Sequence, residues 1–500
     1  MKRLLLTALL LCAGQCVLIS DFARAAEIKT ESFDRDPGWE GFNNRIEPKH
    51  VPTVTQDFGY SATTFASKSP GEVGGRVTRS TRPASYGDKI TKTLEDKLTA
   101  SGTFALTASS PGGGLFFGWF NSNQPGGGGR PMNSLGLDFD GEGSGGRLAV
   151  RLINGVNRTC GTFITPYLPG KFRPTPIRKD GTRYHWTLDY DPQAAGGRGR
   201  FTFTLRSDTH TAQNYGTLSV LSEQEAQARF PNTTQFTVDL PVDFKKEGAT
   251  FDRFGMINMM KAGGTMTMHF ADLRHDGKTE NLARDPGWIG SGNRATYQDR
   301  EQVGAHDFGF SAKTSFAGGA PGELGGNLWR SGDYGYYADR IGALTFADRL
   351  EASGNVVLKV GAPDSDVFLG WFNSAERIKP PAESGHFIGV HVGGPTRVGH
   401  YFHPAFATAK GTRGIAEGGP LLAPGKTFAW TLVYDPMAND GKGELRVTLG
   451  KESVTLALKD GVKAQGGRFD RFGLFTSTAG GQLVRIYLDD LKYTAAPASR

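Results

Sequence analysis

The chain has 500 residues, of which 70 are glycine and 11% are aromatic. Glycine at this level without a three-residue period excludes a collagen-like fibre and indicates many turns. The formal net charge of +7 is scattered along the chain and forms no basic cluster of the kind that nucleic-acid binding needs, so we expect no nucleic-acid partner.

The N-terminal residues have the pattern of an export signal. Lys2 and Arg3 precede an apolar run over residues 4–19, and the small-residue sequence Ala-Arg-Ala follows at 23–25. We therefore expect a signal peptide at residues 1–25, cleavage before Ala26, and a secreted or periplasmic mature protein. No later apolar run reaches the roughly 20 residues that a transmembrane helix requires.

The remainder of the chain repeats itself, with matching blocks in the same order about 250 residues apart. The matched blocks are Arg35–Trp39 with Arg284–Trp288, Asp57–Ser61 with Asp307–Ser311, Pro70–Arg79 with Pro321–Arg330, Phe116–Ser122 with Phe368–Ser374, Trp186–Pro192 with Trp430–Pro436, and Phe251–Gly255 with Phe469–Gly473. The spacing shortens at the last block, which indicates an insertion in the first copy near residues 222–230. Each copy has the size of a whole β domain. We predict two homologous domains, at residues 26–276 and 277–500.

Apolar residues alternate with polar ones along both copies, which is typical of half-buried strands. The clearest alternating sets are Leu135, Leu137 and Phe139 with Ile388, Val390 and Val392, and Met266, Met268 and Phe270 with Val484, Ile486 and Leu488. Glycine-rich turns separate such runs, and long helix-forming runs are scarce. The pattern predicts an all-β chain in which antiparallel sheets pack face to face as β-sandwiches.

The closing strands at 270–273 and 488–491, with the Trp-Thr-Leu-x-Tyr-Asp-Pro block in each copy, resemble the concanavalin A-like or laminin-G-like jelly roll of bacterial exported proteins. The resemblance covers nearly all of the mature chain, although its motifs are of low specificity. It implies two jelly-roll domains in tandem. Many domains of this class are carbohydrate-binding modules or lectins, while others are glycoside hydrolases or polysaccharide lyases, so the fold alone leaves the function open.

Two tryptophan and asparagine pairs are candidate sugar contacts. Trp119 and Asn121 project from the same side of one predicted strand, as do Trp371 and Asn373. Aromatic rings stack on sugar faces, and amides bond the hydroxyls. The alternative interpretation is that both tryptophans are core residues and both asparagines cap turns.

The block Pro-Gly-Glu-x-Gly-Gly, followed by arginine, occurs in both copies. It contains Glu72 with Arg79, and Glu323 with Arg330. Glycine lets a backbone approach a partner closely, and a carboxylate and a guanidinium can bond sugar hydroxyls or acidic groups. An internal ion pair that braces a loop explains the block equally well.

Asp138 and His391 occupy equivalent positions on the polar side of one predicted strand. If this side faces a ligand, the two domains differ in ligand chemistry; otherwise the position is solvent-facing and free to vary. Asp138 and Asp140 have the alternate spacing of a glycosidase carboxylate pair. A lyase would instead use His391 or a tyrosine as base, with Arg79 or Arg330 neutralising a uronate.

Asp272 and Asp490, near the end of each copy, are the candidate metal ligands. Beside Asp36 and Asp285 they would offer the oxygen ligands that a structural calcium ion prefers. No dense Asp-x-Asp loop accompanies them, and the sequence indicates no other cofactor.

These patterns favour a secreted polysaccharide-binding protein with two lectin-like domains and a glycan partner. The alternatives are a polysaccharide-degrading enzyme, either a hydrolase or a lyase, and a structural or adhesive surface protein. The environment of Trp119 and Trp371 discriminates between them: rings that line a groove favour glycan recognition, and enclosed rings favour a structural protein.

Overall fold

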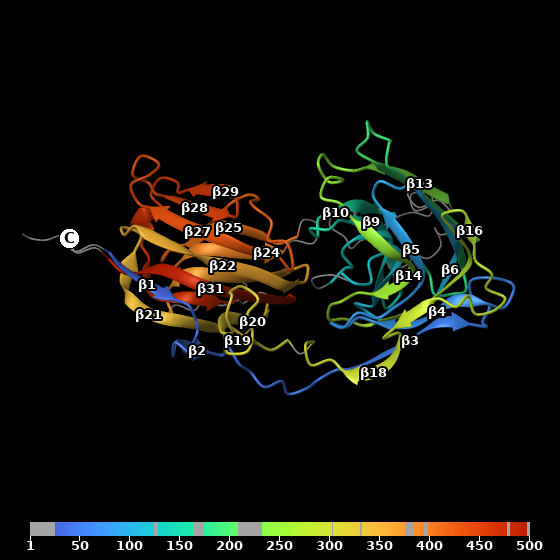
Figure 1. Cartoon of the computed structure of the whole chain (residues 1–500), viewed down its shortest axis with the longest axis horizontal. Coiled ribbons are helices and arrows are strands. Elements are labelled where there is room, and N and C mark those ends of the chain that lie inside the picture. The colour runs from blue at the N-terminus through green and yellow to red at the C-terminus, as the bar shows by residue number, and fades with distance from the viewer. Residues whose placement is uncertain are drawn as a thin grey trace, which may run out of the picture.

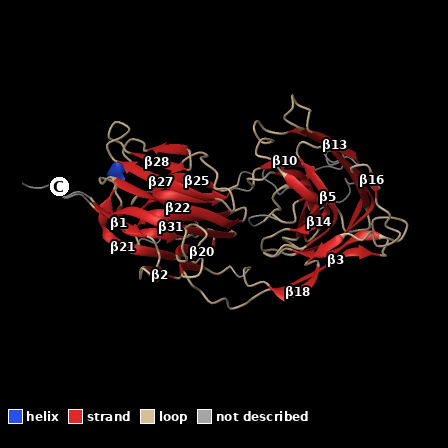
Figure 2. Ribbon diagram, in the orientation of Figure 1, coloured by secondary structure: helices blue, strands red, loops and turns tan. Residues whose placement is uncertain are grey.

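The computed structural model describes residues 26–124, 129–164, 175–208, 233–302, 304–330, 333–375, 385–394, 399–477 and 481–497. This part of the chain is almost entirely β-strand, with a single 3-10 turn at Lys463–Gln465 (Figure 2). It contains no helix long and apolar enough to cross a membrane. The predicted signal peptide and the predicted insertion lie outside the described residues.

The strands form antiparallel sheets that pack as two β-sandwiches, which confirms the predicted fold class (Figure 1). In the first sandwich the large sheet has the order β13 (Thr233–Asp239), β12 (Arg200–Ser207), β11 (Arg183–Asp191), β6 (Leu98–Ser109), β15 (Thr265–His275), β4 (Glu72–Thr78), β3 (Thr53–Ser61) and β18 (Arg294–Gln298), with β16 (Lys278–Thr279) beside β15. The small sheet has the order β10 (Thr159–Phe163), β9 (Gly145–Ile153), β8 (Ser134–Glu142), β7 (Gly114–Phe120), β14 (Thr250–Asn258), β5 (Ser85–Thr93) and β17 (Ile289–Ser291).

The second sandwich has the same plan. Its large sheet has the order β19 (Asp307–Ser311), β20 (Glu323–Trp329), β31 (Leu483–Ala496), β22 (Leu350–Gly361), β27 (Thr427–Asp435), β28 (Glu444–Leu449) and β29 (Glu452–Ala457), with β1 (Glu27–Glu31) beside β31. Its small sheet has the order β2 (Glu40–Phe42), β21 (Tyr336–Thr345), β30 (Arg468–Phe475), β23 (Ser365–Phe372), β24 (Phe387–Gly394), β25 (Tyr401–Ala407) and β26 (Arg413–Ile415).

The predicted alternation places one side of each strand in a core between the two sheets. The alternating residues of β8 and β24 are fully buried there, as are those of β15 and β31: Leu135, Leu137, Phe139, Met266, Met268 and Phe270 in the first core, and Ile388, Val390, Val392, Val484, Ile486 and Leu488 in the second. Burial of this apolar surface is the main stabilising contribution to each sandwich.

Each repeat lends its N-terminal arm to the other sandwich. Arm 1, residues 26–47, leaves the first repeat and pairs through β1 with β31 and through β2 with β21 of the second sandwich (Figure 1). Arm 2, residues 277–298, pairs through β17 with β5 and through β18 with β3 of the first sandwich. The predicted boundary at residue 276 therefore follows the sequence repeat, whereas strand pairing builds each sandwich across that boundary.

The repeated Arg-Asp-Pro-Gly-Trp block fastens each arm to its sandwich. Trp39 is 9% exposed and packs its ring 6.0 Å from that of Tyr337. Asp36 accepts hydrogen bonds from the Tyr337 hydroxyl at 3.2 Å and from a backbone N–H of its own turn. Trp288 and Asp285 make the equivalent contacts with Tyr86 in the first sandwich.

The crosswise arrangement makes a prediction about local stability. Replacing Trp39 by alanine removes a core ring from the second sandwich, at a cost of roughly 3 kcal/mol. Hydrogen exchange should then speed up mainly in strands of residues 307–496, although Trp39 belongs to the first repeat. Trp288→Ala should act mainly on residues 53–275. Faster exchange confined to each tryptophan's own repeat would contradict the exchanged arms.

Candidate functional site

A row of small residues crosses the outer face of each small sheet, and we call it the furrow. In the second sandwich the furrow is formed by register partners on five neighbouring strands: Ala338, Gly473, Gly370, Gly389 and Ala405. A Cβ at Gly370 would lie 2.5 Å from the Ile388 carbonyl oxygen, and one at Gly389 would lie 2.2 Å from that of Leu369. Neighbouring strands therefore approach too closely for a side chain at these glycines, and the row ends in alanine on both sides.

A ladder of five stacked rings flanks this furrow. Phe475, Phe368, His391, His403 and Tyr401 lie on adjacent strands, with successive ring centroids 5.2, 4.7, 5.2 and 5.4 Å apart and interplanar angles of 15° to 26°. Both phenylalanines are fully buried, whereas His391 and Tyr401 are half-buried. The ladder thus runs from a covered apolar end to an accessible polar end.

At the polar end, His391 and Arg330 converge on Asp366. The Asp366 Oδ2 lies 3.4 Å from Arg330 Nε and 3.7 Å from His391 Nε2. Burial alone would raise the pKa of Asp366, but the His391 ring and the Arg330 charge outweigh it and lower that pKa. Several buried polar atoms around the cluster have no hydrogen-bond partner within the described part of the chain: Arg330 Nε, Asp366 Oδ1, His391 Nε2, His400 Nδ1 and Ser477 Oγ.

The two ladder histidines form a directed hydrogen-bond chain. Burial lowers the pKa of His403 to about 4, so this ring is neutral at pH 7. Its Nδ1 donates to the Gly418 carbonyl at 2.8 Å, and its Nε2 therefore accepts from His391 Nδ1 at 3.0 Å. The Nε2 of His391 is left facing Asp366, 3.7 Å from its Oδ2.

The equivalent outer face of the first sandwich is closed. Asp138, which holds the register position of His391, is completely buried and accepts hydrogen bonds from Arg130 and Arg151. Burial by itself would raise the pKa of Asp138, but the two guanidinium groups outweigh it and lower that pKa. Arg130 reaches this position because Gly129, ahead of it, makes two backbone hydrogen bonds with Met260 at 2.7 and 2.6 Å.

This pairing corrects the role predicted for two carboxylates. Asp140 is bound by Arg79, and Asp138 has no exposed surface, so the pair cannot flank a glycosidic bond in this structure. Arg79 is itself buried at 6% exposure, so it too is a structural partner here rather than a sugar contact. Arg79 thus forms an internal ion pair, but with Asp140 and not with Glu72 of its own block, which was the pair that the sequence left open as an alternative.

The candidate tryptophans belong to the cores. Trp119 and Trp371 have no exposed surface, and their ring N–H groups donate to Asp276 Oδ2 at 2.9 Å and to the Thr494 carbonyl at 2.8 Å. Enclosed rings leave no face for a sugar, which corrects their predicted place in a ligand groove. By the criterion given above, this burial favours the structural alternative, so a glycan site must be carried by other residues.

The asparagines that accompany the tryptophans cap turns. Asn121 bonds the Thr250 carbonyl and two backbone N–H groups that follow it. Asn373 bonds the Arg468 carbonyl and the Ala375 N–H. Their amides are thus occupied within the protein, as the alternative interpretation expected.

Both glutamates of the Pro-Gly-Glu block brace loops and are not ligand contacts in this structure. Glu72 is fully buried and accepts from the Ala66 N–H and from the Thr63 hydroxyl at 2.7 Å. Glu323, also fully buried, accepts from the N–H groups of Phe316 and Ala317 at 3.0 and 2.7 Å.

The glycine before each of these glutamates leaves room for the backbone of an arm. A Cβ at Gly71 would lie 1.7 Å from the Leu282 carbonyl oxygen of arm 2, and one at Gly322 would lie 2.0 Å from the Phe33 carbonyl oxygen of arm 1. We predicted that the glycines of this block let the backbone approach a partner closely, and that partner is the arm of the other repeat.

Asp272 and Asp490 occupy strand bulges rather than a metal site. Both have positive φ, and they accept from Thr103 Oγ1 at 3.2 Å and from Asn355 Nδ2 at 2.9 Å respectively. Their expected companions Asp36 and Asp285 bind tyrosine hydroxyls instead. Within the described residues, neither Asp272 nor Asp490 belongs to a group of metal-ligating side chains.

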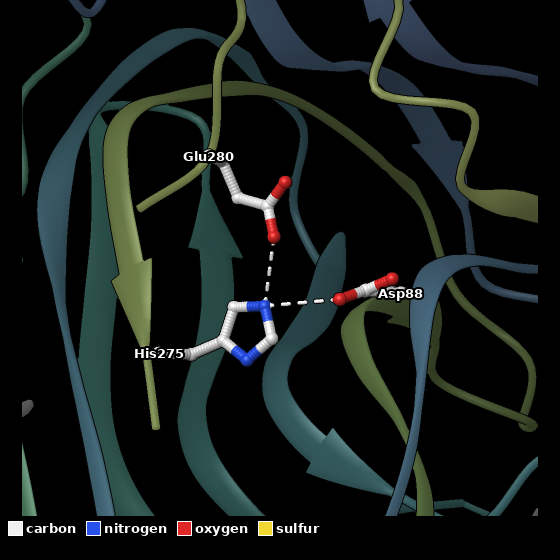
Figure 3. Close-up of side chains that lie close together, drawn as sticks. All are labelled: Asp88, His275 and Glu280. Atoms are coloured by element: carbon white, nitrogen blue, oxygen red, sulfur yellow. Dashed lines mark hydrogen bonds and ion pairs between the residues drawn. The ribbon is translucent and has the colours of Figure 1, made fainter. Parts of the chain in front are cut away.

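One such group does occur, at the foot of arm 2. His275 Nε2 lies 2.9 Å from Glu280 Oε1 and 3.3 Å from Asp88 Oδ2 (Figure 3). The ammonium of Lys278 already lies 2.6 and 2.8 Å from the same two carboxylate oxygens. A metal ion would have to displace this lysine.

The second sandwich has an equivalent of this group at arm 1. There the Tyr493 hydroxyl and Lys29 Nζ each lie 2.7 Å from Asp339 Oδ2. Tyr493 holds the position of His275, and its ring stacks on Phe472 as His275 stacks on Phe254. Because a tyrosine replaces the histidine at the equivalent position, we interpret both groups as contacts that hold the arms against the sandwiches.

The sequence matches no protein-family model and no curated protein. Among solved structures it is similar to domains LG4-5 of the mouse laminin alpha1 chain, with a TM-score of 0.24 and 11% identity, covering 91% of this chain and 100% of that chain. It is also similar to the carbohydrate recognition domain of Emp47p, with a TM-score of 0.25 and 10% identity, covering 37% of this chain and 87% of that chain. A mutant of the GH43 protein BlXynB from Bacillus licheniformis has a TM-score of 0.22 and 10% identity, covering 89% of this chain and 100% of that chain. All three TM-scores are low, so the fold assignment rests on the strand pairing of this chain.

The buried Asp138 network predicts a large loss of stability on breaking it. Arg151→Met removes one guanidinium and leaves Asp138 buried with incomplete charge compensation, which should lower the free energy of unfolding by ~3 kcal/mol. Denaturant unfolding measures this change. Arg200→Met, at an exposed ion pair with Asp239, should change little. Equal effects of the two substitutions would contradict a buried network.

Asp489, which the sequence did not single out, predicts a pH dependence. It is 4% exposed, and burial together with the nearby carboxylates of Asp490, Glu323 and Asp34 raises its pKa from 3.8 to about 6. The folded state thus binds this proton more tightly than the unfolded chain, so stability should rise as the pH falls from above 6 towards 4.

The substitution Asp489→Asn tests this assignment. It should remove this part of the pH dependence and stabilise the protein at pH 7 by on the order of 1 kcal/mol. Unfolding curves at several pH values measure both effects. The exposed control Asp460→Asn should leave the pH profile unchanged, and an unchanged profile for Asp489→Asn would exclude the raised pKa.

Proposed function

We propose that this chain is an exported carbohydrate-binding protein whose ligand site is the polar end of the ring ladder on the second sandwich. The proposal rests on buried polar atoms around Asp366 that have no hydrogen-bond partner among the described residues: Asp366 Oδ1, His400 Nδ1 and Ser477 Oγ. Buried polar atoms are usually hydrogen-bonded, and leaving them unpaired costs free energy that a ligand's hydroxyl groups would recover. Export is inferred from the N-terminal signal pattern.

The mixture of groups at this end suits a sugar. The half-buried Tyr401 ring at the end of the ladder offers a flat face for stacking, and Asp366 and Arg330 offer an acceptor and a donor for hydroxyls. The His391 ring is covered on both faces by Phe368 and His403, so it offers its ring edge only. Of the residues that the sequence predicted as sugar contacts, His391 and Arg330 are the ones that converge here.

The first sandwich has no equivalent sugar site in this proposal. Its equivalent face is filled by the network of Arg130, Arg151 and Asp138, and the apolar residues beside that network are fully buried. The proposal therefore assigns one sugar site to the ladder, and it does not rely on two matching lectin-like sites acting together by avidity.

Cleavage of the glycan at the same end is the second candidate. The observation that favours it is the placement of a histidine beside a carboxylate: His391, bonded through its Nδ1 to His403, lies next to Asp366, and such groups serve general acid–base catalysis. New reducing ends or ultraviolet-absorbing unsaturated products from a bound polymer would support an enzyme. Binding without products would support a recognition protein.

A binding panel of neutral and acidic polysaccharides tests the proposal. His391→Ala and Asp366→Asn should each weaken binding of the polymer that the full chain prefers by about tenfold, because each removes a hydrogen-bonding partner of the ligand. Affinity electrophoresis or calorimetry measures the change.

The matched control for this panel is His185→Ala, which removes a partly exposed histidine from the large sheet of the first sandwich. This variant should bind the preferred polymer like the full chain. Unchanged binding by both ladder-end variants, or no binding by the unaltered protein across the panel, would exclude the proposed site.

A further inference from the structure

We propose that the junction of the two sandwiches contains an oxyanion site, in which Lys261 binds a carboxylate or sulfate group carried by an acidic glycan. The glycan part of this inference rests on the proposed function, whereas the oxyanion part does not. The groups involved are absent from the sequence-based candidates, apart from Arg79.

A narrow cavity of about 60 Å³ lies between the sandwiches. Met260, Lys261 and Ala262 line it from the first sandwich, and Trp329, Ala362 and Gln482 line it from the second. Within the described part of the chain, Lys261 has neither a hydrogen-bond nor an ion-pair partner. Lys261 is partly exposed, and the nearby charges of Asp140 and Asp364 favour its charged form while those of Arg79 and Arg130 oppose it.

Two arginines lie close to Lys261. The backbone bridge between Gly129 and Met260 places Arg130 beside it, and the stem of Arg79 crosses Gly263, where a Cβ would lie 2.6 Å from Arg79 Cδ. Both side chains are more than nine-tenths buried, and Arg79 Nε and Arg130 Nη1 have no hydrogen-bond partner among the described residues.

The local charge is unbalanced towards positive. The buried network and its neighbours contain four cations, at Arg79, Arg130, Arg151 and Lys261, against the carboxylates of Asp138, Asp140 and Asp364. Glu301 also lines the cavity, but it is paired with Arg485 at 2.9 Å. An added anion would therefore complete the charge balance.

The electrostatics of Lys261 agree with this geometry. Burial lowers the pKa of Lys261 to about 8. The charges of Arg79 and Arg130 lower this pKa further, whereas the charges of Asp140 and Asp364 raise it. A bound anion would favour the charged lysine, so binding should be strong at pH 7 and should weaken as the pH rises through 8.

Gln482 narrows the ligand class. Its buried Oε1 also lines this region without a hydrogen-bond partner in the described chain, and an amide oxygen can accept only from a donor. An oxyanion alone offers no donor. A uronate or a sulfated sugar offers the anion and a hydroxyl on the same ring, which is why we favour an acidic glycan over a free ion.

The first test measures binding of the full chain to polygalacturonate and to its neutral, methyl-esterified form. Lys261→Met should weaken binding of the acidic polymer by about tenfold and leave the esterified polymer unaffected. Lys451→Met, at an exposed hairpin position, is the matched control and should bind both polymers like the unaltered protein. Equal binding of the acidic polymer by Lys261→Met and the unaltered chain would overturn the site.

A pH series separates charge from shape. Between pH 7 and pH 9 the unaltered chain should lose about tenfold in affinity for polygalacturonate, because most of Lys261 becomes neutral. Lys261→Arg keeps its charge and should retain binding at pH 9. Parallel loss in both proteins would show that Lys261 is not the ligand.

A chemical probe keeps the two proposals distinguishable. Acetylation of Lys261 by acetic anhydride, followed by mass spectrometry on the full chain, should be slowed by free galacturonate or inorganic sulfate but not by galactose. Protection without polymer binding would support the oxyanion site and reject the glycan function. Absence of protection would reject the site even if neutral polymers bind through the ladder.

Discussion

The exchange of arms is the constraint on which the rest of the molecule depends. Each sandwich completes its core and its sheet edges with a segment of the other repeat, so Trp39 and Trp288 bury in the sandwich that their own repeat does not form. Apolar burial of this size is a large fraction of a domain's net stability. The two sandwiches are therefore tied into one molecule, and the junction cavity with Lys261 lies between them.

Close backbone approach explains most of what the two repeats share. The glycines of the furrow and of the Pro-Gly-Glu block lie where a Cβ would collide with a neighbouring carbonyl, as at Gly71 and Gly370. Glycine is the residue that a strand can use there, whatever the protein binds. Glu72 and Trp119 of β7 also serve the fold. Glu72 satisfies loop N–H groups, and Trp119 fills the core. These shared residues thus report on folding, whereas His391 of the proposed site stands at a position where the repeats differ.

The main difference lies on the outer faces of the small sheets. At one register position the first sandwich has Asp138, neutralised by two arginines, and the second has His391 within a ladder of rings. A buried carboxylate with guanidinium partners is a closed, structural arrangement. His391 has one ring nitrogen without a hydrogen-bond partner among the described residues, so it is open to a ligand. One backbone plan therefore supports a sealed face in one sandwich and an accessible one in the other.

The sequence by itself determined the fold class, because period-two alternation and glycine-rich turns depend on local geometry that recurs along each strand. It also determined the repeat and the equivalence of Asp138 with His391. It could not show the exchanged arms, because a matching block fits either sandwich equally well and only the connection through space selects one. Nor could it show that Trp119 lies inside the core while His391 lies on the outer face of its sheet, since alternation assigns residues to opposite faces without saying which face is covered. The clustering of Lys261 with Arg79 and Arg130 was likewise decided by tertiary structure, which brings distant loops of two sandwiches to one cavity where their charges act together.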